Sequence, residues 1–277
     1  MPGTLYLVAT PIGNLKDISQ RAIETLAEVD LIACEDTRHS RKLLNAIGVS
    51  NKLVSYHEHN EAERSDEFGK LLIEGKSIAL VSDAGTPGIS DPGYRLVQKA
   101  HETGSEVVSI PGPVAFVNAV IISGLPTDSL YFGGFLPSRS GDRRKSLSAV
   151  ADLSCTIIFY ESPHRLAKSL GDCFEILGDR NAAVVRELTK LHEEVVRGNL
   201  SELAAKYSSA NPKGEIVLVI AGRTDNAVPV QTETALATRV AELESAGEDR
   251  KAALKRAAKE FGLSKSEAYR KLQSEKK

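Results

Sequence analysis

Acidic and basic side chains cluster directly after a predicted strand near the start of the chain. The strand is expected over residues 30–34, and the sequence EDTR follows it. Glu35 and Asp36 could accept a proton as general bases, and Arg38 could contact a phosphate. Asp36 or Thr37 could equally cap the helix that follows, and the residue types support this structural role about as well as a catalytic one.

A second cluster of polar residues, in the sequence FYESPHRL, follows a predicted strand that ends at Glu161. Ser162 and Pro163 predict a helix start, with Ser162 as the N-cap and Pro163 at the first helical position. This cap explains those two residues but leaves Glu161, His164 and Arg165 without a structural role. They are therefore candidates for a functional site.

The histidines and cysteines do not form a metal-binding pattern. His57 and His59 lie two residues apart and could face the same way on an extended segment, but no third ligand occurs at metal spacing. We interpret them as a polar rim. Cys34, Cys155 and Cys173 are too widely spaced for a metal knuckle or an even disulfide framework. We expect no metal and a reducing compartment.

Three turns rich in glycine and proline follow predicted strands. The first turn, residues 9–15 (ATPIGNL), is typical of an ordinary strand-to-helix connection when taken alone. The second turn, residues 81–93 (VSDAGTPGISDPG), combines three glycines with two prolines, which indicates a fixed, open loop that a ligand can approach closely. The third turn is residues 109–113 (SIPGP). Because parallel strands end at one edge of a sheet, these turns predict a ligand site there.

Short apolar runs alternate with amphipathic segments of helical length along residues 1–222, which predicts an α/β protein, and over residues 1–112 this alternation predicts a mostly parallel sheet. Gly112 and Pro113 interrupt this pattern and indicate two domains, residues 1–112 and 113–222. The strands are expected over 4–9, 30–34, 52–55, 77–82, 106–110, 130–135, 156–161, 182–186 and 215–220, and the helices over 17–29, 38–47, 60–74, 92–102 and 114–122.

The composition is that of an ordinary globular protein. Of the 277 residues, 42% are hydrophobic and 26% are charged, which argues against wholesale disorder, collagen-like repeats and coiled-coil rods. The N-terminal sequence lacks a basic segment followed by an apolar one, and no apolar run reaches about 18 residues. We therefore expect a cytoplasmic protein that does not bind membranes.

The net charge of −2 is divided unevenly along the chain. Residues 238–277 carry 11 Lys and Arg against 7 Asp and Glu, a net charge of +4, so the preceding residues have a net charge of −6. An acidic body discourages indiscriminate binding to nucleic acid, whereas a basic segment can bind RNA phosphates. The two parts are therefore expected to have different partners.

A small helical extension is predicted at the C-terminal end. Residues 223–232 have the composition of a linker, and residues 233–277 predict a compact helix-turn-helix. The alternative to RNA binding is a solvated helical cap or a dimer element. The helices are expected over 234–245, 249–261 and 265–272, the core at Ala252, Ala253, Ala257, Ala258, Phe261, Leu263, Ala268 and Leu272, and the RNA contacts at Lys251, Lys255, Arg256 and Lys259.

Several motifs taken together resemble one known family. The sequences VATPIGNLKDIS, ACEDTR, SYHEHN, VSDAGTPGISDPG, IPGP, FYESPHRL and RELTK occur in this order between residue 4 and about residue 222. With them the chain resembles the ribosomal RNA small subunit methyltransferase I family, and its basic extension resembles that family's C-terminal region. The resemblance implies a two-domain tetrapyrrole-methylase-like (class III) α/β fold with a small all-helical extension, S-adenosylmethionine bound between the domains, and a homodimer.

The resemblance also implies an activity and a donor site. The activity would be 2'-O-methylation of a cytidine ribose in the decoding region of 16S ribosomal RNA, with the 30S subunit as partner. The donor would lie against the three turns, and a tyrosine of the second domain would close over its adenosine. Carried over position by position, the donor site comprises Thr10, Pro11, Ile12, Gly85, Thr86, Pro87, Ile89, Ala115, Phe116 and Tyr160.

Methyl transfer to a hydroxyl requires alignment of donor and acceptor and a place for the hydroxyl proton. A carboxylate against the sulfonium would stabilise the ground state more than the transition state, so we expect a donor pocket of backbone and small side chains. Any base should lie on the acceptor side. The candidate bases are Glu35, Asp36 and Glu161, and the residues expected to steer phosphates are Arg38, Arg165 and Lys190.

Two other functions are compatible with the same sequence. A tetrapyrrole C-methyltransferase on this fold would share the donor site, but the basic extension argues against it. A non-catalytic RNA-binding assembly factor would retain only a vestigial nucleotide pocket, and the intact set of three turns argues against that.

Overall fold

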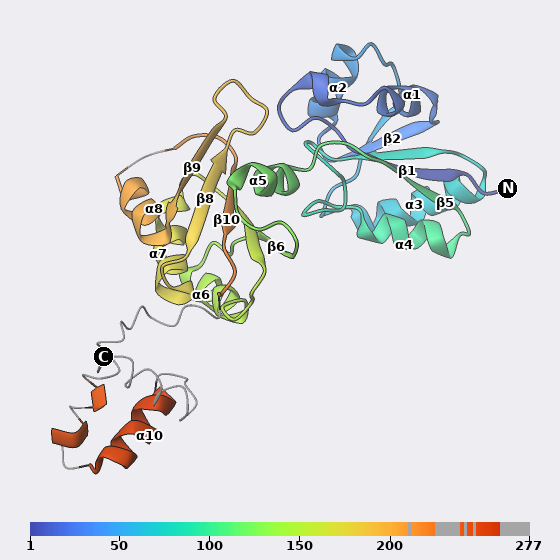
Figure 1. Ribbon diagram of the computed structural model, residues 1–277. Coiled ribbons are helices and arrows are strands. Elements are labelled where there is room, and N and C mark those ends of the chain that lie inside the picture. Colours follow the sequence, from blue (N-terminus) through green and yellow to red (C-terminus); the bar gives the residue numbers. More distant parts are fainter. Residues whose placement is uncertain (210–211, 225–238, 241–242, 246–247, 261–277) are drawn as a thin grey trace. The chain divides into compact units, whose positions relative to one another are not determined.

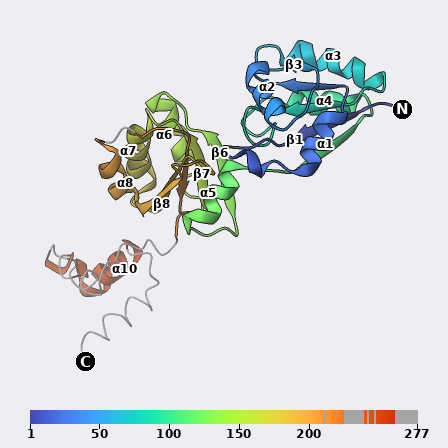
Figure 2. The same cartoon turned by 90° about the horizontal axis from the view of Figure 1, so that it is seen from above.

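The computed structural model describes residues 1–209, 212–224, 239–240, 243–245 and 248–260 (Figure 1). By their contacts, residues Met1–Gly222 form one compact unit and Arg223–Lys277 form another. The larger unit contains two separate five-stranded sheets, which Figure 1 and Figure 2 show from two directions. We call residues 1–112, with the first sheet, the first domain, and residues 113–222, with the second sheet, the second domain.

The first sheet is fully parallel and has the order β3-β2-β4-β1-β5. Its strands are β1 (Thr4–Val8), β2 (Leu31–Cys34), β3 (Leu53–Ser55), β4 (Ile78–Val81) and β5 (Glu106–Ile110). The sequences of β2 and β4, LIAC and IALV, are buried at every position, as expected of central strands covered on both faces.

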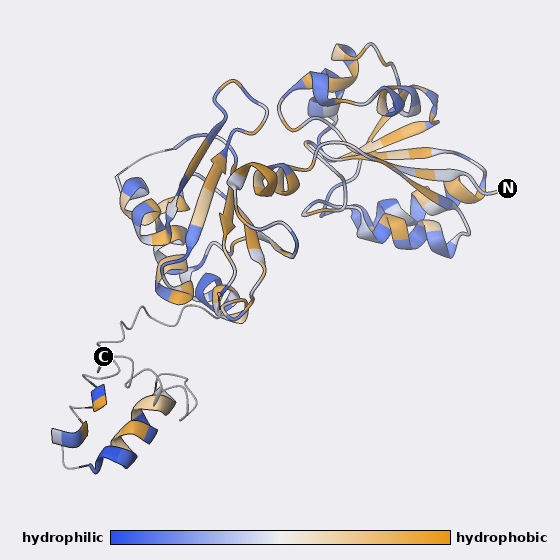
Figure 3. Ribbon diagram, in the orientation of Figure 1, coloured by the Kyte–Doolittle hydropathy of each residue, from blue (hydrophilic) through white to orange (hydrophobic). Residues whose placement is uncertain are grey.

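Helices cover both faces of this sheet. They are α1 (Gln20–Glu28), α2 (Thr37–Ala46), α3 (Glu61–Ile73) and α4 (Tyr94–Glu102), and the 3-10 helix η1 (Leu15–Asp17) precedes them. Successive residues of a strand point to opposite faces, so Ile32 packs in the core with α1 and α2, whereas Leu31 packs with α3 and α4. Figure 1 shows the two helix pairs on opposite sides of the sheet, and Figure 3 shows the apolar residues concentrated in its strands.

The second sheet is mixed and has the order β6-β7-β10-β8-β9. Only the β6/β7 pair is parallel, and β10 runs antiparallel to both of its neighbours, β7 and β8. The prediction of a mostly parallel sheet for residues 1–112 is therefore confirmed, whereas the antiparallel pairs of the second sheet were not predicted. The strands are β6 (Leu130–Phe135), β7 (Thr156–Glu161), β8 (Asn181–Arg186), β9 (Glu194–Asn199) and β10 (Ile216–Ile220).

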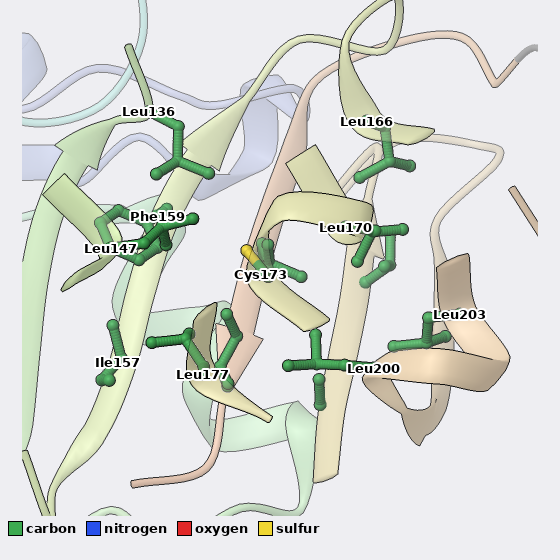
Figure 4. Packing of buried hydrophobic residues seen from close by; sticks show 14 of the residues in the cluster. Leu136, Leu147, Ile157, Phe159, Leu166, Leu170, Cys173, Leu177, Leu200 and Leu203 are labelled. Carbon is green, nitrogen blue, oxygen red and sulfur yellow. The ribbon is translucent and has the colours of Figure 1, made fainter. Parts of the chain in front are cut away.

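One helix covers one face of the second sheet and three cover the other. Helix α5 (Ala115–Ser123) packs on one face through Ala119 and Val120. Helices α6 (Ser140–Ala149), α7 (Leu166–Leu177) and α8 (Leu200–Tyr207) pack on the other. Figure 4 shows part of the buried cluster on this face, which includes Leu147, Phe159 and Cys173. Neither α6, α8 nor β9 was expected from the sequence.

The FYESPHRL segment folds differently from the prediction. Residues 162–165 form a turn, and α7 begins only at Leu166, with Arg165 at its N-cap position. Ser162 is therefore not the cap. Its carbonyl accepts from the backbone N–H of Arg165 at 3.0 Å, which closes a turn before the helix begins.

The described part of the extension contains helix α10 (Arg250–Glu260), within the helix predicted over 249–261. Asp249 caps it by accepting from the backbone N–H groups of Lys251 and Ala252. Ala252 was expected in the core and is exposed, whereas Leu254, which was not expected there, is buried. The helix predicted over 265–272 and most of the predicted linker lie outside the described residues. No described helix is long and apolar enough to cross a membrane.

Candidate functional site

The first and second turns are joined by backbone hydrogen bonds. The N–H of Thr10 donates to the carbonyl of Gly85 at 2.8 Å, and the N–H of Gly85 donates to the carbonyl of Thr10 at 3.1 Å. The Thr10 hydroxyl is fully buried and donates to the carbonyl of Ser82 at 3.3 Å. Thr10 therefore fixes the two turns to each other, and its side chain does not face a ligand.

Gly85 is the point at which all three turns meet. Its φ of +87° favours glycine, and a Cβ added there would lie 3.3 Å from the Ile12 side chain and 3.6 Å from the Pro113 carbonyl. The next residue, Thr86, donates its hydroxyl to the same Pro113 carbonyl at 3.4 Å. The expected convergence of three strand-end turns is thus present in the structure.

A cavity of about 360 Å³ opens beside this junction and has walls from both domains. Its volume is within the range of small-molecule sites, ~300–1,000 Å³. The first domain contributes Ile12, residues 83–86 and residues 89–91, and the second contributes Val114, Ala115, Phe135, residues 160–163 and residues 214–217.

Six of the ten residues predicted to bind the donor line this cavity, and four do not. Thr10 is buried in the turn junction, and Pro11 and Pro87 are outside the lining. Phe116 stacks on Phe132 with ring centroids 4.3 Å apart, in the core beneath α5. The lining residues are Ile12, Gly85, Thr86, Ile89, Ala115 and Tyr160.

Sequence reasoning missed one whole wall of the cavity, residues 214–217. It followed the carboxyl ends of strands, but this wall is the amino end of β10. Because β10 is antiparallel to β7, Ile216 pairs with Glu161 and lies at the edge where β7 ends. The apolar pattern of a single strand does not encode the direction in which the strand pairs. The glycine at position 214 is the one sequence signal that could have indicated that residues 214–217 approach the cavity.

The chain was compared with known proteins. The sequence model of the family described as Tetrapyrrole (Corrin/Porphyrin) Methylases matches residues 4–204. A protein of Halalkalibacterium halodurans named "Ribosomal RNA small subunit methyltransferase I" is 48% identical over 96% of this chain and 93% of its own length. The chain belongs to the ribosomal RNA small subunit methyltransferase I family. It is a methyltransferase with the class III fold expected from the sequence.

Two further members of the methyltransferase I family show how far the likeness extends. A Bacillus subtilis protein of the same name is 44% identical over 96% of this chain and 93% of its own length. A Thermotoga maritima protein of that name is 48% identical over 80% of this chain and 99% of its own length. About a fifth of the present chain thus has no counterpart in the aligned Thermotoga sequence.

Solved structures support the fold. A uroporphyrin-III-C-methyltransferase from Thermus thermophilus superimposes with a TM-score of 0.56 at 19% identity, over 78% of this chain and 94% of that one. A cobalt precorrin-4 methyltransferase gives the same TM-score and coverage at 18% identity. At this identity the likeness shows the class III fold alone.

Carboxylates line the cavity of this methyltransferase, contrary to the expectation of backbone and small side chains only. Asp83 and Asp91 both belong to the second turn. Burial, together with the nearby charges of Glu35 and Asp83, raises the pKa of Asp91 to about 6. Burial and Asp83 also raise the pKa of Glu35, which lies outside the lining. The cavity is therefore an anionic environment that favours a cationic ligand.

Asp36, a predicted base, is the N-cap of α2. Its carboxylate accepts from the backbone N–H of Arg38 at 2.8 Å and forms an ion pair with the Arg38 guanidinium at 3.0 Å. The side-chain hydrogen bond from Arg38, followed by the backbone one, lowers the pKa of Asp36 to about 2. A carboxylate with so low a pKa is a poor proton acceptor, and the structural alternative explains this residue.

Glu161, a second predicted base, has a structural role after all. Its side chain is 0% exposed. It accepts from the backbone N–H of Ser162 and from the hydroxyl of Ser169, and it forms an ion pair with Arg165 at 2.7 Å. The expectation that Glu161 and Arg165 lack a structural role is therefore wrong, because they hold the end of β7 to the start of α7.

The basic residues expected to bind phosphates fall into two groups. The Arg38 side chain is 89% exposed and can reach a partner, as can the exposed Lys251 and Lys255 of α10. Lys190 instead pairs with Glu187 and Glu215, at 2.9 and 3.2 Å. A further exposed residue of α10, Arg256, pairs with Glu248, and the side chain of Lys259 lies outside the described residues.

The histidines after β3 lie close together without forming a metal site. The rings of His57 and His59 are 5.9 Å apart, and the Asn60 side chain accepts from the backbone N–H of His57. Among the described residues, no group of three or more His, Cys, Asp or Glu side chains could hold a metal ion. The three cysteines, all described, are free.

Proposed function

We propose that this chain transfers a methyl group from S-adenosylmethionine to the 2'-hydroxyl of a cytidine ribose in the decoding region of 16S ribosomal RNA. The observation that carries the proposal is the cavity at the junction of the three turns, found in a chain of the methyltransferase I family. The names of its relatives support ribosomal RNA of the small subunit as the substrate. We further propose that the enzyme acts in the cytoplasm as a homodimer.

The cavity fits S-adenosylmethionine in size and charge. When bound, this donor supplies an electrophilic methyl group on a sulfonium centre, and it carries a separate ammonium group. Asp83 and Asp91 supply carboxylates that can pair with the ammonium group, which avoids the unfavourable contact with sulfur. Tyr160 and Phe135, with ring centroids 5.2 Å apart, offer an aromatic wall for the adenine.

The chain contributes to catalysis chiefly by alignment. Fixing two reactants in a near-attack geometry can lower a barrier by ~7–11 kcal/mol, whereas a general base contributes typically ~10²–10⁴-fold. Of the three predicted bases, Asp36 and Glu161 are committed to a cap and an ion pair. Glu35, whose raised pKa makes it the better proton acceptor, is therefore our candidate for the hydroxyl proton.

RNA binding is assigned to exposed cations. Arg38 flanks the acidic end of β2, and the extension supplies Lys251 and Lys255 on an exposed face of α10. We do not assign a phosphate contact to Lys190, because its ammonium group already pairs with two carboxylates. The division of charge between −6 over residues 1–237 and +4 over residues 238–277 supports this assignment.

The test is transfer of labelled methyl to 30S subunits and to free 16S RNA. A 2'-O-methyl group removes the hydroxyl that attacks the neighbouring phosphodiester in alkali, so the label should appear in an alkali-resistant dinucleotide within the decoding region. Label on a base, or no label, would contradict the ribose proposal. Label on a tetrapyrrole and not on RNA would favour the tetrapyrrole alternative.

A pair of glycine variants controls this experiment. Gly85 and Gly48 both have positive φ, at +87° and +73°, so replacement by Ala strains both backbones alike. Only Gly85 adjoins the cavity, whereas a Cβ at Gly48 would meet nothing within 4 Å. We expect Gly85→Ala to lose most transfer and Gly48→Ala to retain it.

A further inference from the structure

The connection between β8 and β9 contains an unusual backbone. Among the described residues, three other than glycine have positive φ: Ser90 in the cavity, and Glu187 (+51°) and Thr189 (+63°) in this connection. A β-branched residue such as threonine is disfavoured in the left-handed region. The Thr189 hydroxyl oxygen is also buried without a hydrogen-bond partner in the described structure. Both features oppose stability, so something else must account for them.

This connection packs against the first turn of the other domain. A Cβ added to Gly13 would lie 2.5 Å from Cγ of Lys190, 2.8 Å from the Thr189 hydroxyl oxygen and 3.0 Å from the Leu188 carbonyl. Position 13 therefore has no room for a side chain. The preceding residue, Ile12, lines the cavity, so the connection supports the first turn immediately behind the cavity wall.

The same connection also holds the amino end of β10, which forms another part of the cavity wall. The Glu187 carboxylate accepts from the backbone N–H of Glu215 at 3.2 Å, and Lys190 bridges the carboxylates of Glu187 and Glu215. A Cβ at Gly214 would overlap the Glu187 carboxylate. The hydrogen bond from Lys190 lowers the pKa of Glu187, which keeps this carboxylate ionised. Gly214 and Glu215 both line the cavity.

We propose that residues 187–190 form a positioning turn for the donor cavity, which sets the first turn through Gly13 and the amino end of β10 through Glu187. None of these four residues lines the cavity, so they act through residues that do. The proposal rests on the function proposed above insofar as S-adenosylmethionine is the ligand positioned. It explains why a strained backbone and an unpaired hydroxyl persist, because both keep Thr189 against Gly13.

The main variant is Thr189→Gly, which relieves the unfavourable φ and removes the contact with Gly13. We expect its melting temperature to stay within about 2 °C of the wild type, since relief of strain offsets the added freedom of the unfolded chain. Its dissociation constant for S-adenosylmethionine, measured by calorimetry, should rise at least fivefold. Thr189→Asn, which tolerates the left-handed region and keeps a side chain, should bind within twofold of wild type. The exposed His192 in the same connection provides His192→Ala as a control.

A second variant approaches the contact from the other side. Gly13→Ala introduces the blocked Cβ, whereas Gly171→Ala adds a Cβ that meets nothing within 4 Å. We expect Gly13→Ala to weaken donor binding at least fivefold and Gly171→Ala to leave donor binding unchanged. Combining Gly13→Ala with Thr189→Gly should cost less than the two single effects multiplied, because they disturb one contact.

Backbone hydrogen exchange without ligand gives an independent readout. Thr189→Gly should lower the protection of residues 10–16 and 214–217 and leave the helices α6, α7 and α8 unchanged. The proposal would be overturned if the Thr189→Gly variant showed wild-type exchange at these segments and wild-type donor affinity. It would also be overturned if the melting temperature of this variant fell in parallel with its donor affinity. If the wild-type protein binds no S-adenosylmethionine, the proposed function fails, and the exchange result still decides whether residues 187–190 position these two segments.

Discussion

The two domains hold their parts of the cavity by different means. In the first domain, backbone bonds between Thr10 and Gly85 and close packing at glycine join the turns. In the second, ion pairs hold the strand ends, namely Glu161 with Arg165 and Lys190 with two carboxylates. One wall is therefore fixed by local chain geometry and the other by charges, which predicts different responses to mutation, pH and salt.

The largest effect is expected where the second domain loses a buried charge. Glu161→Ala removes the partner of Arg165, whose side chain is only 27% exposed, and leaves three hydrogen-bonding groups unsatisfied. Breaking a buried pair in this way costs about 3–5 kcal/mol of unfolding free energy. Urea denaturation of the residue 1–222 unit would measure it. The control is Asp142→Ala, at an exposed residue of α6. Equal stability of the two variants would contradict the claim that ion pairs hold the second domain.

The next effect concerns the charge that the first domain places in the cavity. Asp91→Asn should weaken S-adenosylmethionine binding at least tenfold, because a charge-assisted hydrogen bond is worth about 1.5–3 kcal/mol. The control is Asp66→Asn, on α3, where Asp66 forms an ion pair with Lys99 of α4. This variant should bind S-adenosylmethionine normally. Calorimetry at pH 7.5 measures both. Wild-type affinity in the Asp91 variant would show that this wall acts through its backbone alone.

The pH dependence of binding sharpens the same test. The pKa of Asp91 is about 6 against an ordinary value of 3.8, so its carboxylate loses charge as the pH falls through 6. Donor affinity of the wild type should therefore decrease between pH 7.5 and pH 5. The contribution of this group to the free energy of unfolding changes in the opposite direction and increases as the pH falls, because the native carboxyl binds a proton more tightly than the unfolded chain does. This group destabilises the fold near pH 7 and ceases to do so below about pH 4.

The extension should affect RNA and not the donor. Ending the chain at Ala237 removes a net charge of +4, and we expect RNA affinity at ~0.1 M salt to fall about tenfold with a shallower salt dependence. Lys251→Glu with Lys255→Glu should reproduce much of this loss in a full-length chain. Filter binding at several salt concentrations measures it. Unchanged RNA affinity would leave the solvated-cap or dimer alternative.

The smallest effect is expected at the backbone junction of the first domain. Thr10→Val removes the weak bonds from the hydroxyl to the carbonyls of Ser82 and Gly85 but leaves both backbone bonds to Gly85. A net cost of about 1 kcal/mol in unfolding free energy and less than a threefold change in donor affinity should result. Thermal denaturation and calorimetry measure these. A large loss of donor binding would mean that side chains, and not the backbone, hold this wall as well.

The first domain was largely predictable from sequence because its signals are local. Runs such as LIAC and IALV are buried on both faces, and the glycines and prolines of residues 81–93 mark the turn that shapes the cavity. Four residues of this domain that were predicted from the family resemblance to bind the donor, Ile12, Gly85, Thr86 and Ile89, line the cavity. The side chain of Thr10 lies outside the cavity lining because it holds the first turn to the second.

The second domain was harder to predict because its contacts are distant in sequence. The pairing of β10 between β7 and β8 brings residues 214–217 to the cavity, and no local pattern encodes that direction. The buried partners of Glu161 likewise include Ser169, eight residues away on a helix that begins later than predicted. The pKa of Asp91 depends on Glu35, which follows another strand, so sequence alone could not single out this aspartate.

The position of β10 bears on how the protein is made. It is the last strand of the body along the chain, yet it lies at the centre of the second sheet. The first sheet is complete once β5 has left the ribosome, whereas the second lacks its middle strand until about residue 220 has been synthesised. During translation, therefore, the first domain can fold while β7 and β8 still wait for the strand that joins them.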